Sequence, residues 1–118
     1  MMADLILDPT AISNLRTLSP DDGDAFLKEI IGIFLEDTPI RITELHKSRV
    51  SGDAITFTRA AHSIKGSSSN VGAQELRSIA EKLEYQARQR GIDDVEALVA
   101  ELEAAFIRTK EALKPFTT

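Results

Sequence analysis

The chain has 118 residues, a net charge of −5 from 14 Lys and Arg against 19 Asp and Glu, and no cysteine. Without cysteine it has no disulfide, no thiolate nucleophile and no Cys-ligated zinc or iron–sulfur site. An acidic chain without a basic cluster is not expected to bind DNA or RNA, because that affinity comes largely from Lys and Arg that neutralise phosphates. The expected partner is therefore a protein.

The first predicted helix follows a leader at residues 1–7, which lacks the basic segment and long apolar stretch of a secretion signal. Asp8 followed by Pro9 is typical of a helix start, with an N-cap and a proline at the first helical position. This helix contains Ile12 and Leu15, and we expect it to be short because a polar stretch follows it.

Apolar residues then recur at spacings of three, four and seven over about residues 23–50, which predicts a long amphipathic helix. Pro39 interrupts this pattern, since proline removes one hydrogen bond and crowds the preceding turn. We expect a kink there; the alternative is a fresh helix capped by Asp37 or Thr38. The start of the long helix is apolar nearly all round, which indicates either a docking patch or a surface covered by the first helix.

Turn and cap residues predict three more helices. Two of them span about residues 54–70 and 73–90, and the last begins at a cap on Asp93 or Asp94 and is closed by Pro115. No stretch shows the period of two that is typical of strands.

Long amphipathic helices joined by short connections pack antiparallel to one another. We therefore predict an all-α fold, an antiparallel up-and-down four-helix bundle with a short additional N-terminal helix. We expect one domain over residues 1–118, with a tail at 116–118. This domain is expected to act as a monomer. The longest apolar run is far too short to span a membrane, and we expect a soluble cytoplasmic protein.

On a helical wheel the third predicted helix gathers its apolar and small residues on one face, which is expected to face the core: Phe57, Ala61, Ile64, Ser68 and Val71. His62 lies about 140° away from the centre of that face, together with Lys65, Gly66 and Ser69. Each of these residues alone fits an ordinary helix surface. Together they suit a surface where another protein's backbone approaches an imidazole closely and leaves an anion on it.

Residues 60–73 read AAHSIKGSSSNVGA. This run closely resembles the signature of histidine-containing phosphotransfer (HPt) domains, in which a phosphorylated His is followed by two residues, Lys-Gly, small residues and then Gly-Ala. The likeness extends to residues 34–39, 51–53 and 83–84, and so covers most of the chain.

The resemblance implies a phosphorelay intermediate. His62 would accept a phosphoryl group from an aspartyl phosphate on a response-regulator receiver domain, downstream of a hybrid sensor kinase, and pass it to another receiver aspartate. Lys65 would stabilise the phosphoryl oxygens. Glu84 stands where the family usually has Gln or Glu and would hold the second ring nitrogen; an ion pair with Arg88 is an equally weighted alternative, and the two can coexist.

The resemblance also implies a phosphocarrier rather than an enzyme, with no ATP site and no cofactor of its own, since the divalent metal belongs to the receiver's carboxylate pocket. The partner is expected to dock on an apolar and small-residue surface around the histidine: Ile12, Leu15, Ile31, Leu35, Ile55, Gly66, Ser69 and Arg88.

Two other classes of function stay open. A metal-dependent helical-bundle enzyme is less favoured, because neither His46 nor His62 has a Glu three residues before it. A binding-only bundle that docks a signalling partner is the second alternative, and the intact pair of His62 and Lys65 speaks against it. His46 is interpreted as a surface residue. The kinase, the receivers, the direction of phosphate flow and the question of a stand-alone protein or an excised domain are left open.

Overall fold

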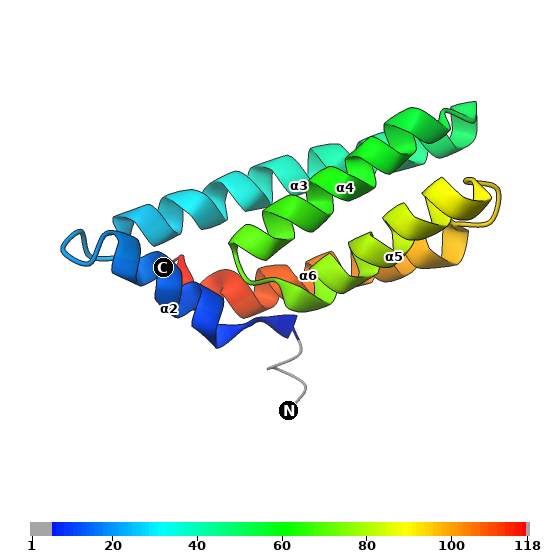
Figure 1. Ribbon diagram of the computed structural model, residues 1–118. Coiled ribbons are helices and arrows are strands. Elements are labelled where there is room, and N and C mark those ends of the chain that lie inside the picture. Colours follow the sequence, from blue (N-terminus) through cyan, green and yellow to red (C-terminus); the bar gives the residue numbers. More distant parts are fainter. Residues whose placement is uncertain (1–5, 118) are drawn as a thin grey trace.

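The computed structural model describes residues 6–117, and within them every regular element is helical (Figure 1). The elements, in chain order, are α2 (Pro9–Leu18), α3 (Ala25–Ser51), α4 (Ala54–Asn70), α5 (Gln74–Arg90), α6 (Glu96–Leu113) and a terminal 3-10 helix, η1 (Lys114–Phe116). The predicted helices are all present, within a few residues of their expected bounds.

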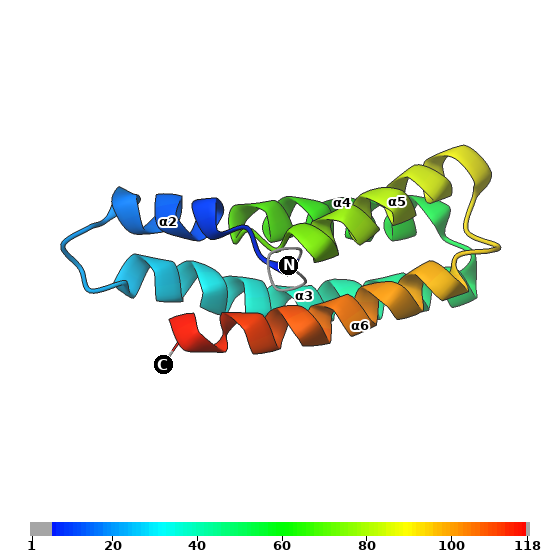
Figure 2. The same cartoon turned by 90° about the horizontal axis from the view of Figure 1, so that it is seen from below.

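The four long helices run up and down in turn, as short connections between them require (Figure 1). Helix α4 packs between α3 and α5, and α6 returns beside α5 and α3. Helix α2 lies along the N-terminal half of α3, beyond the end of α4 (Figure 2). The all-α prediction of a four-helix bundle with a short additional N-terminal helix is confirmed.

Two of the predicted helix caps are present. The Asp8 carboxylate accepts a hydrogen bond from the Thr10 backbone N–H at 3.0 Å, and the Asp53 carboxylate accepts one from Thr56 at the same distance. The predicted cap at Asp93 or Asp94 is wrong, because α6 begins after Val95 and has no side-chain cap. Val95 is fully buried, so the loop after α5 is fixed by an apolar contact with the core and not by a capping carboxylate.

Helix α3 continues through Pro39 as one element. The alternative of a fresh helix after this proline is therefore wrong. On either side of it, Thr38 donates its hydroxyl to the Phe34 carbonyl at 2.8 Å and Thr43 donates to the Pro39 carbonyl at 3.0 Å. A single long α3 gives α2 and α6 one continuous surface on which to pack.

The core extends further toward both ends of the chain than predicted. Leu7, assigned to the leader, is buried, and Ile6 packs against the core beside it. Phe116, assigned to the tail, also packs against the core, and the Arg16 guanidinium lies over its ring at 5.4 Å. Residues 6–7 and 116 thus belong to the bundle, whereas residues 1–5 and 118 lie outside the described residues.

Gly72 holds the turn between α4 and α5 against the start of α2. Its φ is +71°, and its carbonyl accepts a hydrogen bond from the Asp8 N–H at 2.7 Å. A Cβ atom at this position would lie 2.7 Å from the Ala11 Cβ and 3.0 Å from the Asp8 carbonyl oxygen. Both the backbone conformation and the close approach therefore require glycine.

Gly72→Ala is expected to lower the free energy of unfolding by about 2–4 kcal/mol, as the sum of left-handed backbone strain and overpacking. Urea unfolding measures this. Gly52→Ala is the matched control, because Gly52 has φ +77° but nothing within 4 Å of its would-be Cβ, and it should lose only the strain component. Equal losses in the two variants would contradict the proposed clash with α2.

Candidate functional site

His62 lies near the middle of α4, on the side that faces away from the core. The residues predicted to form the core face of this helix are buried: Phe57, Ala61, Ile64, Ser68 and Val71. The His62 side chain is 60% exposed. The helical wheel prediction for α4 is confirmed, and the imidazole is open to a partner.

The Glu84 carboxylate, on α5, holds one nitrogen of the ring. Its Oε2 lies 2.9 Å from His62 Nδ1, while its own side chain is only 8% exposed. The contact reaches across the α4–α5 interface, one of the two main packing surfaces of α4. Among the described residues, Nδ1 is the ring nitrogen with a hydrogen-bond partner, so the hydrogen bond orients the ring and leaves Nε2 available.

Two cations bind the same carboxylate. Lys65 Nζ lies 2.7 Å from Glu84 Oε1, and Arg88 Nη2 lies 2.8 Å from Oε2, the oxygen that also contacts His62. The two contacts foreseen for Glu84, with His62 and with Arg88, are both present. The contact with Lys65 was not foreseen, because it depends on how far the lysine stem bends toward α5.

Glu84 is ionised because of these three donors. Burial by itself raises the pKa of Glu84, but hydrogen bonds from Lys65, His62 and Arg88 outweigh it and hold the pKa below its ordinary value of 4.5. A carboxylate with a lowered folded-state pKa stabilises the fold above its unfolded-state pKa, and this contribution is lost as the pH falls through the folded value.

The free energy of unfolding of the wild type should therefore fall relative to that of Glu84→Gln as the pH drops below about 4.5. In the range just above about pH 5.5, the difference between the two free energies should be constant. Urea unfolding of both proteins over this range tests the prediction. Glu81→Gln is the control, since Glu81 is an exposed carboxylate one turn earlier on α5 that is paired with Arg77 at 3.3 Å. The same acid-side loss in both comparisons would contradict a special role for the Glu84 cluster.

The surface around His62 is open and weakly apolar at one end. A hollow beside the ring is lined by Ala54, Ile55, Thr58, Arg59, His62 and Arg88. Ile55 is 73% exposed, so an apolar side chain stands in solvent two turns before the histidine. One turn after the histidine, Gly66 is exposed, and a Cβ there would meet nothing within 4 Å, so this glycine is not required by the packing of the bundle itself.

A family model described as the Hpt domain matches residues 29–112, which include His62 and all three of the groups described around it. The chain belongs to the Hpt domain family. The resemblance of residues 60–73 to the family signature is thereby confirmed over a much longer segment.

Solved and curated relatives of this Hpt domain agree with the assignment. The crystal structure of histidine-containing phosphotransfer protein B from Pseudomonas aeruginosa superposes with a TM-score of 0.83 and 29% identity, covering 93% of this chain and 92% of that one. Multistep phosphorelay regulator 1 of Schizosaccharomyces pombe is 26% identical over 96 residues, or 81% of this chain. Histidine-containing phosphotransfer protein 2 of Arabidopsis thaliana is 27% identical over 70 residues, or 57% of this chain. The match spans only 32% and 45%, respectively, of the two curated relatives.

Half of the predicted docking residues of the Hpt domain are exposed: Ile55, Gly66, Ser69 and Arg88. Of these, Ile55 and Arg88 line the hollow beside the ring. Ile12 and Ile31 are buried, at 3% and 0% exposure, and their assignment to a docking surface is wrong. Leu15 and Leu35 are half-buried and pack against the core. The reason is that α2 covers the apolar start of α3, so these side chains pack between helices and are not available to a partner.

Three residues of the site were not among the predicted site residues. Thr58 and Arg59 line the hollow beside His62, and the 66% exposed Tyr85 lines a second hollow over Lys65 and Glu84. Tyr85 follows Glu84 directly and points outward from α5. The helical spacing of the buried residues of α5, which include Leu76, Ile79 and Leu83, could have indicated this, because Tyr85 does not share their face. Ile33, one of the apolar residues at the start of α3, is also exposed.

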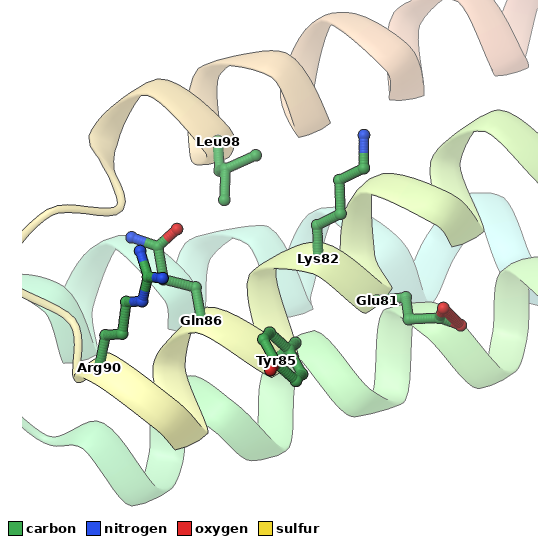
Figure 3. Close-up of a pocket in the computed structure, with 6 residues that line it drawn as sticks. All are labelled: Glu81, Lys82, Tyr85, Gln86, Arg90 and Leu98. Carbon is green, nitrogen blue, oxygen red and sulfur yellow. The ribbon is translucent and has the colours of Figure 1, made fainter.

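A further hollow lies between α5 and α6, where Leu98 extends from α6 toward Lys82 and Gln86 on α5 (Figure 3). Its lining also includes Tyr85 and Glu81, which line the hollow over Glu84 as well. Neither His62 nor Lys65 lines it. The exposed face of α5 therefore separates the groove of Figure 3 from the histidine.

His46, interpreted as a surface residue, is half-exposed and has a partner of its own. Its Nε2 lies 2.9 Å from Glu103 Oε1, a contact between α3 and α6. Across residues 6–117, no three His, Cys, Asp or Glu side chains gather into a group that could hold a metal ion. None of the described helices is both long and apolar enough to cross a membrane.

Proposed function

We propose that this Hpt domain is a phosphorelay intermediate that carries a phosphoryl group on His62 Nε2. The observation that supports this most directly is the hydrogen bond between Nδ1 and a buried carboxylate, which leaves Nε2 as the free ring nitrogen on an exposed surface. An oriented, accessible imidazole is what a nucleophile toward phosphorus requires.

In the proposed forward step, the Nε2 lone pair attacks the phosphorus of an aspartyl phosphate on a receiver domain. The new Nε2–P bond forms as the bond between phosphorus and the aspartate oxygen breaks, and the aspartate leaves as a carboxylate. Nδ1 keeps its proton, which Glu84 holds at 2.9 Å. Transfer to a second receiver aspartate is the same step in reverse, so one geometry serves both.

Lys65 is proposed to neutralise the transferred group. Its ammonium lies one helical turn from His62 and is held by Glu84 at 2.7 Å, from where a change of side-chain rotamer would take it to phosphoryl oxygens on Nε2. Any divalent metal is assigned to the receiver's own carboxylate pocket. The domain is proposed to have no ATP site and to act as a carrier.

The proposed partners are receiver domains, including the receiver of a hybrid sensor kinase. The hollow with Ile55, Thr58 and Arg59 on one side of the ring and the open space over Gly66 on the other would take the rim of the receiver's active site. Arg59 and Arg88 place positive charge there, which suits a partner whose site is built from carboxylates. One copy of the chain supplies every residue of this arrangement, so we propose that a monomer is the active form.

The test is incubation of the purified protein with a receiver that carries labelled aspartyl phosphate. Label is expected to move to the Hpt domain, to be lost in acid and to resist alkali, as a phosphohistidine does. A second, unlabelled receiver added afterwards should then take up the label. Stable binding of receivers without any transfer of label would contradict the proposal and favour a binding-only bundle.

A further inference from the structure

Glu84 creates a chemical difficulty for the nucleophile that it orients. A carboxylate beside an imidazole holds its N–H but also stabilises the doubly protonated imidazolium. The imidazolium has no lone pair on Nε2 and cannot attack phosphorus. A neutral glutamine amide at this position would orient the ring without this cost. A site that uses Glu84 therefore needs something that reduces the negative charge felt by His62.

The contacts of Glu84 show where this charge is reduced. Oε2 faces His62 Nδ1 at 2.9 Å and Arg88 Nη2 at 2.8 Å, so the ring and the guanidinium share one oxygen atom. The Glu84 side chain is 8% exposed, so water competes little with these donors. Arginine stays charged at every physiological pH, so Arg88 withdraws negative charge from Oε2 continuously.

Lys65 cannot supply this function throughout the reaction. It binds the other carboxylate oxygen, Oε1, and in the proposed function it turns to the phosphoryl group. Arg88 extends from the same helix as Glu84, one turn later, and can stay on Oε2 during that exchange. Arg88 is thus the cation that remains with Glu84 while Lys65 is engaged elsewhere.

The charged groups near the ring come from the two helices that line the hollow beside it and the hollow over Glu84. Those on α4 are Arg59 and Lys65, and those on α5 are Glu81, Glu84 and Arg88, with the neutral Tyr85 beside them. No described residue of α3, the other helix packed on α4, lines either hollow. These groups make three positive charges against two negative ones, so loss of Arg88 would remove the positive excess.

We propose that Arg88 is a positioning residue that keeps His62 neutral and nucleophilic by sharing Glu84 Oε2 with the ring. This rests on the proposed function only for its kinetic consequence. The charge state of the ring itself can be measured without any transfer of phosphate.

The direct test is an NMR titration of the His62 ring C–H signals in the wild type and in Arg88→Gln. The variant should protonate its ring at a pH higher by about one unit, since one opposite charge fewer faces Glu84. The kinetic counterpart is labelling of His62 by phosphoramidate, a small donor whose P–N bond breaks to release ammonia. Its pH–rate midpoint should move up by the same amount, so the rate falls up to about 10-fold below the midpoint and converges with the wild type at alkaline pH.

Three further variants separate this role from a merely structural one. Arg77→Gln removes an arginine that makes the same type of contact on the same helix, with Glu81 at 3.3 Å, and should leave the NMR titration and the pH–rate midpoint unchanged. Arg88→Lys retains a positive charge and should return both midpoints most of the way to their wild-type values. In a Glu84→Gln background, Arg88→Gln should cause a much smaller upward shift, because Oε2 is no longer charged and only the direct effect of Arg88 on the ring, across the hollow that both line, remains.

Superimposable titrations of the wild type and Arg88→Gln would overturn the inference, as would an equal shift in the Glu84→Gln background. Its failure is distinguishable from failure of the proposed function. An NMR shift in a protein that receivers do not label would retain the charge role of Arg88 and reject phosphotransfer. Labelling by receivers with no NMR shift in Arg88→Gln would retain phosphotransfer and reject the charge role of Arg88.

Discussion

Replacing His62 by Gln should abolish labelling of the Hpt domain by a phosphorylated receiver. The amide of glutamine has a similar length and polarity but no nitrogen lone pair that can attack phosphorus. The fold should be unaffected, because the His62 side chain is 60% exposed and lies off the core face of α4. The readout is acid-labile, alkali-stable label on the protein after a short incubation, with transfer expected to fall to background.

His46→Gln is the matched control for this experiment. His46 is also half-exposed on a long helix and has a carboxylate partner at the same distance of 2.9 Å, Glu103 Oε1. It lacks a neighbouring lysine and glycine in the pattern seen after His62. Labelling should be retained in this variant. Label that survives His62→Gln, or that disappears in His46→Gln, would refute the assignment of the phosphorylated residue.

Lys65→Ala should slow transfer from receiver to His62 by about 100-fold, while binding of the receiver is largely retained. The magnitude is that of removing one group that stabilises charge developing in a transition state. Binding should persist because Lys65 is held inward, with 28% of its side chain exposed and its ammonium 2.7 Å from Glu84. Single-turnover transfer and a separate affinity measurement with an unphosphorylated receiver distinguish the two effects.

Lys82→Ala serves as the control for charge alone. Lys82 is an exposed lysine on α5, but it lines the groove toward α6 and not the hollow beside His62 (Figure 3). Its removal should change the transfer rate by less than about twofold, as screening of a distant surface charge allows. A transfer rate in Lys65→Ala equal to that of the wild type would remove the role given to Lys65, and so would a slowing explained entirely by weaker receiver binding.

Local sequence patterns predicted the fold and the position of the nucleophile well, for physical reasons. The start of α2 at Asp8 and that of α4 at Asp53 follow from hydrogen bonds within a few residues of each cap. The exposure of His62 follows from helical periodicity, which places it away from the buried Phe57 and Ile64. The pairing of Glu84 with the ring was indicated by the resemblance to the family.

Features that depend on packing between helices were not predictable in the same way. The start of α3 is apolar nearly all round, so the sequence alone did not distinguish the side that α2 covers from the side left open. Ile31 is buried and Ile33 is exposed, although they are two residues apart and chemically identical. The convergence of Lys65, His62 and Arg88 on one carboxylate also depends on the separation of α4 and α5, which no local pattern specifies.

In the proposed relay, the open setting of the ring determines the order of events. Among the described residues His62 has one partner, at Nδ1, and its Nε2 lies on an exposed surface of α4 that has Ile55 before the ring and Gly66 after it. A donor and an acceptor that both use this surface exclude each other, so the first must depart before the second arrives. The kinetics should be those of a ping-pong exchange, and an excess of either unphosphorylated receiver should compete with the other. In the proposed relay the phosphoryl group stays on His62 between the two encounters, so the lifetime of the phosphohistidine sets how long the signal persists.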